Sequence, residues 1–134
     1  MKKAILTINV ISILFVLSLS ARVLPQDVIW NSDESGYYTI KNNSIVLVST
    51  VGKKDKNILT SSDVSGMEIE SFFFSQDKKK VLIFTNSVRV WRYNTRGDYF
   101  VYDLKSKDGH RLGSSLPEKS LMFAKFSPNS RSVA

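Results

Sequence analysis

The 134-residue sequence contains no cysteine and a single histidine, His110. Without cysteine there can be no disulfide, no thiolate metal site and no thiol nucleophile. One histidine also excludes a histidine metal cluster. A Gly-x-Ser-x-Gly segment, the nucleophile elbow of many serine hydrolases, is missing as well. We therefore expect no cofactor, no metal and no catalytic residue in this chain.

Helical periodicity is also missing from most of the chain. No stretch after Ala21 shows apolar residues at a sustained 3.6-residue spacing, so we expect essentially no helix there. The composition, with 43% hydrophobic and 23% charged residues, is that of a globular chain. These two observations together favour an all-β domain.

The net charge of +7 does not by itself identify a partner. The basic runs Lys53 to Lys56 and Lys78 to Lys80 fall in predicted turns, where solvated lysines are ordinary. Because no nucleic-acid-binding motif accompanies them, we expect no nucleic-acid partner.

The first 20 residues have the layout of a secretory signal peptide. Lys2 and Lys3 precede an apolar run from Ala4 to Leu19, and Ser18 and Ser20 supply small residues at the cleavage site. We expect a signal-peptide helix over residues 1–20, cleavage before Ala21, and a secreted or periplasmic product. The alternative is an uncleaved N-terminal membrane anchor, although the run is shorter than the roughly 20 residues that a span needs.

A short pattern occurs three times in the rest of the chain. An aromatic residue is followed by Asp or Asn three positions later and by a strand-like residue seven positions later. The copies begin at Trp30, Phe74 and Phe126, which are 44 and 52 residues apart. Repeats of about 40–50 residues with strands between them indicate a β-propeller. The third copy meets the C-terminus, so we expect an incomplete propeller domain over residues 21–134.

The predicted strands group into blades. We expect blade 1 over about 27–60, blade 2 over about 68–113 and the start of blade 3 over about 121–134. Several strands are apolar on both faces, which predicts burial between neighbouring blades. The expected strands are 27–30, 37–41, 44–50, 58–60, 69–74, 81–85, 99–104, 111–112 and 121–126, and 88–92 is expected to be a strand or an extended loop, with Gly97 interrupting the second blade.

Local chemistry predicts several smaller features. Asp33 and Asp77 should accept hydrogen bonds from turn backbones, and Asn42-Asn43 should form a two-residue hairpin turn with positive φ. Arg96 and Asp98 are expected to form an ion pair within a turn, and Trp91 to pack inside its blade.

The second half of the chain resembles a known family. The resemblance rests on the segment 74–86, on Trp91-Arg92 before the Tyr-rich strand that ends at Tyr102-Asp103-Leu104, and on the segment 120–128. These segments resemble the N-terminal propeller of bacterial dipeptidyl peptidase IV-type enzymes, in the prolyl oligopeptidase superfamily. The similarity extends over roughly residues 28–134.

The resemblance implies a function for the parent protein. Family members join an eight-bladed propeller to a C-terminal α/β-hydrolase domain and remove N-terminal dipeptides, or in relatives tripeptides, from peptide substrates. The propeller gates and positions the substrate, and the parent is expected to form a homodimer. The catalytic serine, aspartate and histidine lie in the hydrolase domain, which this sequence does not contain. We therefore expect no peptidase activity from the chain alone.

One functional position of the family is matched here. Arg92 stands where the family's arginine reaches into the central cavity and contacts a substrate carbonyl. Val88, Val90 and Arg92 have the same strand parity, so the arginine ends an apolar face and requires a partner or a cavity. The competing interpretation is an ordinary edge arginine that pairs with Asp98 or with solvent.

A second function class also fits the sequence. A non-enzymatic periplasmic β-propeller that binds a protein or peptide partner would show the same repeats. A hydrolase sequence downstream in the same reading frame would favour the peptidase, whereas further blades followed by a stop would favour the binding protein.

Overall fold

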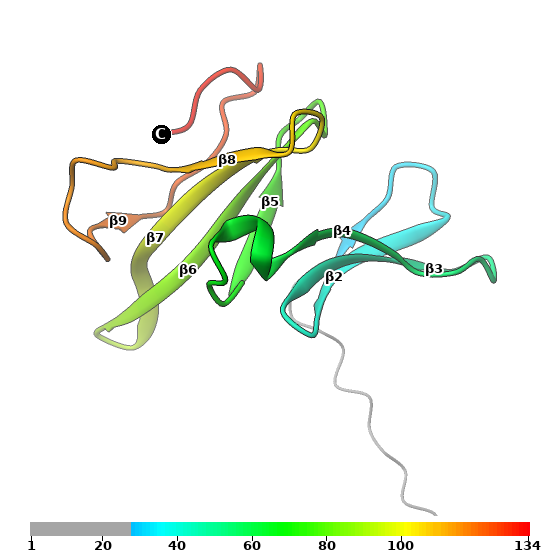
Figure 1. The fold of residues 1–134 in the computed structure, drawn as a ribbon, viewed down its shortest axis with the longest axis horizontal. Helices are drawn as coiled ribbons and strands as arrows, with labels where there is room; N and C mark the ends of the chain where they lie inside the picture. Colours follow the sequence, from blue (N-terminus) through cyan, green and yellow to red (C-terminus); the bar gives the residue numbers. More distant parts are fainter. Residues whose placement is uncertain (1–27) are drawn as a thin grey trace, which may run out of the picture.

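The structure, a computed structural model, describes residues 28–134, so the predicted signal peptide lies outside the described residues. The described part is built almost entirely of antiparallel β-strands, which confirms the all-β prediction (Figure 1). It contains no helix that is both long and hydrophobic enough to cross a membrane.

The strands form two separate sheets. The first is a four-stranded meander in sequence order, made of β1 (Ile29–Trp30), β2 (Gly36–Lys41), β3 (Ser44–Ser49) and β4 (Lys56–Thr60). The second has β5 (Ser71–Phe74), β6 (Lys80–Val90), β7 (Tyr93–Asp103) and β8 (Asp108–Arg111) in order, and β9 (Leu121–Met122) pairs with β7. Two consecutive four-stranded meanders are the units that the blade prediction requires.

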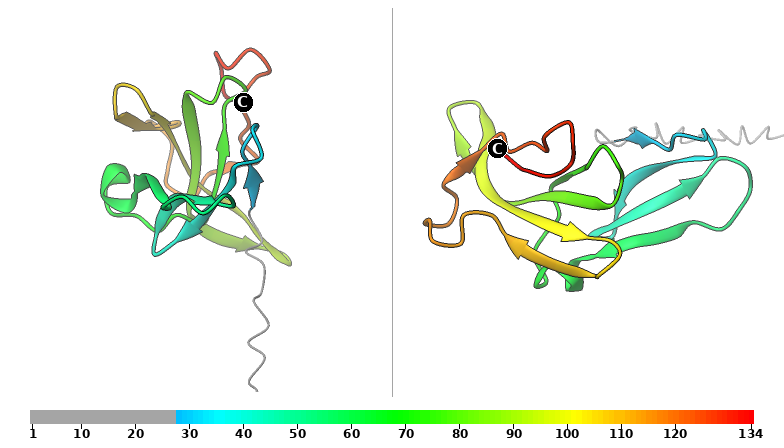
Figure 2. Two further views of the ribbon diagram at one scale, coloured as in Figure 1. Left: turned by 90° about the vertical axis from the view of Figure 1, so that its right-hand side faces the viewer. Right: turned by 90° about the horizontal axis from the view of Figure 1, so that it is seen from above.

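The second sheet is buried on both faces. On one face Phe72, Val81 and Ile83 pack with Ile45 and Leu59 of the first sheet. On the other face Leu82, Phe84, Tyr99 and Val101 pack with Ala124 and partly with other residues of the C-terminal segment. Figure 2 shows this segment running over the second sheet. The alternation along β6 and β7 therefore places apolar side chains on both sides, as the two-faced strands of the sequence predict.

The three sequence repeats fold into one kind of turn. In each copy the Asp or Asn side chain accepts a hydrogen bond from the backbone N–H two residues later, over 3.0 Å for Asp33, 3.1 Å for Asp77 and 3.1 Å for Asn129. The residue after each of them has a positive φ of 57°, 54° and 60°, respectively. The prediction that Asp33 and Asp77 hold turn backbones is confirmed.

The predicted turn at Asn42-Asn43 is also confirmed. Both residues have positive φ, 49° and 56°, between the paired residues Lys41 and Ser44. The Asn43 side chain also accepts from the Ile69 backbone N–H over 2.7 Å. Asn43 thereby ties the first sheet to the segment that leads into the second.

The connector after β4 contains one short 3₁₀ turn (η1, Ser61–Val64), with Val64 buried, which agrees with the expectation of essentially no helix. Two local expectations are wrong. Gly97 does not interrupt a strand but lies inside β7. The predicted strand over 121–126 is limited to Leu121–Met122, and it pairs with β7 of the second sheet at Arg96 and Gly97.

Candidate functional site

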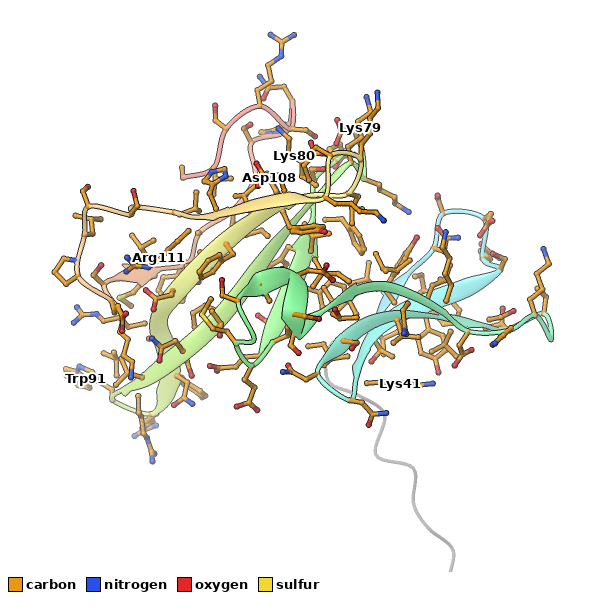
Figure 3. All side chains as sticks on the ribbon, viewed as in Figure 1. Lys41, Lys79, Lys80, Trp91, Asp108 and Arg111 are labelled. Carbon is orange, nitrogen blue, oxygen red and sulfur yellow. The ribbon has the colours of Figure 1, made fainter. Side chains whose placement is uncertain are left out.

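The predicted binding residue Arg92 lies at the tip of the long β6–β7 hairpin. Val90 pairs with Tyr93, so Trp91 and Arg92 form the two-residue turn, in which Trp91 has a φ of 62°. The expected strand over 88–92 thus ends at Val90, and Arg92 does not continue a strand face with Val88 and Val90. The hairpin extends beyond the rest of the second sheet, and Trp91 marks its end in Figure 3.

The side chains at the tip are exposed to solvent. Trp91 is 94% exposed and Tyr93 is 73% exposed, so the prediction that Trp91 packs inside its blade is wrong. Arg92 is exposed as well. An aromatic pair that flanks a guanidinium in this way can contact both the apolar and the polar parts of a peptide.

The outer part of the hairpin, residues 88–96, carries positive charge only. Residues 88–96 include Arg89, Arg92 and Arg96 and no carboxylate. Within residues 28–134 the ion pairs join Lys41 to Asp55 and Arg111 to Asp98, so Arg92 has no carboxylate partner there. The Arg89 Nε donates to the Trp91 carbonyl over 3.2 Å, which helps to close the turn. Arg92 is therefore free to donate to a carbonyl or carboxylate of another molecule.

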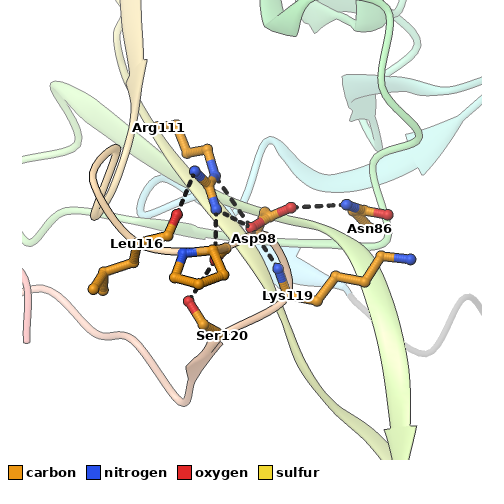
Figure 4. A network of polar contacts seen from close by, with 7 residues as sticks. Asn86, Asp98, Arg111, Leu116, Lys119 and Ser120 are labelled. Atoms are coloured by element: carbon orange, nitrogen blue, oxygen red, sulfur yellow. Dashed lines mark hydrogen bonds and ion pairs between the residues drawn. The ribbon is translucent and has the colours of Figure 1, made fainter.

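Asp98 organises the base of this hairpin (Figure 4). Its Oδ1 accepts from Arg111 Nη2 over 2.8 Å and from the Lys119 backbone N–H over 2.9 Å. Its Oδ2 accepts from Asn86 Nδ2 over 2.8 Å. The expected pair of Arg96 with Asp98 is wrong, because β8 brings Arg111 alongside the carboxylate while Arg96 stays exposed.

The electrostatics of Asp98 follow from these bonds. Burial raises the pKa of the carboxyl, but the hydrogen bonds from Asn86, Lys119 and Arg111, together with the Arg111 charge, outweigh burial, so the pKa lies below its ordinary value. The Asp98 side chain is 3% exposed. It is therefore an ionised, fully bonded anchor.

Sequence reasoning did not find the roles of Asn86, Asp98 and Arg111. The signal for Asn86 is the polar pair Asn86-Ser87 that interrupts an otherwise apolar strand, a pattern typical of a bulge. Arg111 gives no such signal, since it lies 13 residues from Asp98 and the two meet only through strand pairing.

The other candidate sites offer fewer charged or metal-binding side chains. A surface pocket of about 540 Å³ is lined by Trp30, Asn31, Ser32, Glu34 and Thr50, with Glu34 its only charged side chain. No group of three or more histidine, aspartate or glutamate side chains that could hold a metal is found in the described part of the chain. The hairpin tip is therefore the candidate functional site.

The β6–β7 hairpin lies in a segment that matches a known protein family. Residues 75–134, which include the whole β6–β7 hairpin, match the family model of the dipeptidyl peptidase IV (DPP IV) N-terminal region. Dipeptidyl aminopeptidase B of Saccharomyces cerevisiae is 33% identical over 109 residues, which cover 78% of this chain and 13% of the yeast protein. The probable dipeptidyl-aminopeptidase B of Aspergillus terreus is 29% identical over 103 residues, or 77% of this chain and 10% of that protein.

The fold is similar to part of a solved structure. The crystal structure of Porphyromonas gingivalis dipeptidyl peptidase 4 matches 79% of this chain with a TM-score of 0.65 and 19% sequence identity, over 16% of its own length. The chain thus spans between 10% and 16% of these three proteins. The similarity includes fungal proteins and is not restricted to bacterial ones.

Proposed function

We propose that this chain is the N-terminal β-propeller region of a serine dipeptidyl peptidase, and that Arg92 binds a carbonyl of the peptide substrate. One observation carries the proposal. The segment that matches the DPP IV N-terminal region holds an exposed arginine at the tip of an anchored hairpin, and within residues 28–134 this arginine has no carboxylate partner. In the longer protein the propeller gates and positions peptides, and a C-terminal hydrolase domain, absent from this sequence, supplies the catalytic triad.

The proposal gives Arg92 a role in binding rather than in bond cleavage. A guanidinium is permanently charged and donates through a rigid fork, which suits a carbonyl that must be held in one orientation. It neither accepts nor releases a proton at physiological pH. The hairpin tip would therefore fix the substrate, while proton transfer and nucleophilic attack belong to the hydrolase domain.

The test uses the longer protein encoded by the reading frame that contains this chain. With an Xaa-Pro chromogenic dipeptide substrate, Arg92→Ala should lower kcat/KM by about 10- to 150-fold, because a hydrogen bond to a charged donor contributes about 1.5–3 kcal/mol. Arg92→Lys should recover only part of the loss, since the ammonium lacks the fork.

Arg96→Ala is the matched control for the Arg92 variants. It removes an exposed arginine from the same hairpin without changing the turn, and it should keep the parent kinetics. If Arg92→Ala folds normally and cleaves at the parent rate, the binding role is wrong. A reading frame with further blades and no hydrolase domain would instead support a non-enzymatic propeller that binds a protein or peptide.

We also propose that the protein is exported, with cleavage after Ser20. The support is the basic start, the apolar run and the small residues at the cleavage site. N-terminal sequencing of the periplasmic or secreted product should begin at Ala21. A product that retains Met1 in the membrane fraction would instead identify an N-terminal anchor. The homodimer expected for the parent is tested on the same preparation by sedimentation.

A further inference from the structure

The β6–β7 hairpin contains two register shifts: a β-bulge at Asn86 and Ser87, near its base, and a second shift between Val88 and Arg89, nearer the tip. Thr85 pairs with Asp98, and the next pair toward the tip is Val88 with Arg96. Asn86 and Ser87 of β6 therefore face the single residue Gly97 of β7, and Asn86 has a φ of 53°. A bulge of this kind bends a strand and redirects the residues beyond it.

Two carboxylates from outside the tip hold this bulge. Asp98 Oδ2 accepts from the Asn86 amide over 2.8 Å, and Glu70 Oε1 accepts from the Ser87 backbone N–H over 2.7 Å. The other oxygen of Asp98 binds Arg111 and the Lys119 backbone. Both Asn86 and Ser87 are thus tied to the segments around the second sheet.

Gly97, the residue opposite the bulge, has no room for a side chain. A Cβ placed on Gly97 would lie 2.5 Å from Phe84 Cε2 and 2.8 Å from the Thr85 carbonyl oxygen. Gly97 also pairs with Leu121 of β9. The hairpin is therefore packed closely at the bulge, whereas Trp91, Arg92 and Tyr93 at the tip are exposed.

The direction of the tip therefore depends in part on the bulge at Asn86 and Ser87, together with the second register shift between Val88 and Arg89. Arg92 lies about 15–20 Å from Asn86 at the roughly 3.3 Å rise per residue of a strand. Over that length a tilt of about 5° at the bulge would move the guanidinium by about 1.5 Å, which is enough to break a hydrogen bond whose donor and acceptor must lie within about 3.2 Å.

We propose that Asn86, with Asp98 and Glu70, is a positioning residue that aims Arg92 at the substrate carbonyl through the bulge. The inference rests on the proposed function, since it needs Arg92 to bind the peptide. It assigns a role in recognition to three residues that touch no substrate themselves.

The experiment is a double-mutant cycle in the longer protein. Asn86→Gly removes the amide but keeps a residue that adopts positive φ without strain. We expect KM for an Xaa-Pro chromogenic dipeptide to rise about tenfold with kcat nearly unchanged, the pattern of lost ground-state binding. In an Arg92→Ala background the same change should cost nothing further, because the group that it aims is already absent.

Conservative and control variants separate positioning from stability. Glu70→Ala should raise KM like Asn86→Gly, whereas Glu70→Gln, which keeps an oxygen acceptor for the Ser87 N–H, should restore it. Asp103→Ala is the matched control, because it removes two turn bonds, to the Lys105 and Ser106 backbone, at the opposite end of β7. It should leave KM unchanged even where it lowers the melting temperature.

The outcomes are distinguishable. If Arg92→Ala raises KM but Asn86→Gly keeps the parent KM, or adds its full effect on top of Arg92→Ala, the positioning role is wrong and the binding role of Arg92 stands. If neither Arg92→Ala nor Asn86→Gly changes the kinetics, the binding role of Arg92 is wrong, and the positioning role is wrong with it.

Discussion

At the scale of single residues, Asp98 shows how strand pairing creates a site that residue spacing does not reveal. Its two oxygens bind groups from β6, β8 and the connector before β9. The neighbouring Arg96, which spacing alone favours as its partner, stays exposed. Burying an ionised carboxylate that is 3% exposed destabilises the fold unless all of these donors bind it.

The stability that Asp98 contributes should depend on pH. Because its folded pKa is lowered, the contribution is present above the unfolded value near 4 and is lost as the pH falls through the folded pKa. Asp98→Asn should cost about 2–3 kcal/mol at pH 7, less than for a fully buried pair because Arg111 keeps some exposure. Urea unfolding of the purified chain at pH 7, 5 and 3 measures this.

The difference in stability between parent and Asp98→Asn should shrink as the pH approaches 3. Asp55→Asn, at the exposed Lys41–Asp55 pair, serves as the control and should have a much smaller effect than Asp98→Asn, because solvent screens an exposed pair. A difference that is as large at pH 3 as at pH 7 would show that ionisation of Asp98 is not what stabilises the fold.

At the scale of elements, the repeated turn is the unit that the sequence predicts best. Ser75 in the second copy donates to Asp77 Oδ1 over 2.7 Å, and Ser127 in the third copy donates to Asn129 Oδ1 over 2.7 Å. In the first copy the Asn31 amide donates to Asp33 over 2.7 Å. Asp and Asn therefore serve equally as acceptor, because only an oxygen is needed.

This equivalence predicts which substitutions the turn tolerates. Ser75→Ala should destabilise the chain by about 1–2 kcal/mol, since Ser75 is buried and its hydroxyl also accepts from the Lys80 backbone N–H over 3.0 Å. Asp77→Asn should leave the melting temperature nearly unchanged, as Asn129 already performs the same task. Thermal unfolding followed by circular dichroism compares the two, and equal losses would contradict the equivalence.

The sequence predicts the strands and turns well and the tip and base of the long hairpin poorly. Turns such as Asn42-Asn43 and Asp77 depend on neighbours within a few residues, so local chemistry is sufficient. The strand-like alternation of Val88, Val90 and Arg92 continues past the point where the strand ends, and nothing in the sequence indicates the positive φ of Trp91 that ends it. The start of the predicted third blade illustrates the same limit, since the pairing of β9 with β7 depends on partners 24 and 26 residues away.

At the scale of the whole molecule, the two sheets leave apolar surface uncovered. Phe73 on the edge strand β5 is 51% exposed, and Phe123 after β9 is 63% exposed. An exposed edge strand with an aromatic side chain is a template for pairing with another chain. In the proposed propeller a following blade would cover this region.

The chain alone should therefore self-associate as its concentration rises. Phe73→Lys should shift it toward the monomer, because a charge on an edge strand opposes edge-to-edge pairing. Val51→Lys is the matched control, since Val51 is 58% exposed but lies in a loop. Sedimentation velocity at several concentrations measures the mass. Monomeric behaviour of the unmodified chain at every concentration would contradict the prediction.

The order of the strands also bears on how the polypeptide is made. In both sheets the first four strands are hydrogen-bonded in sequence order, so each pairing among them joins consecutive strands. These pairings therefore close short loops, at low entropic cost and high speed. The strands can join their sheet in the order of synthesis, the first meander being complete before the second emerges. Its inner face, with Ile45 and Leu59, then serves as the template on which β5 to β8 condense.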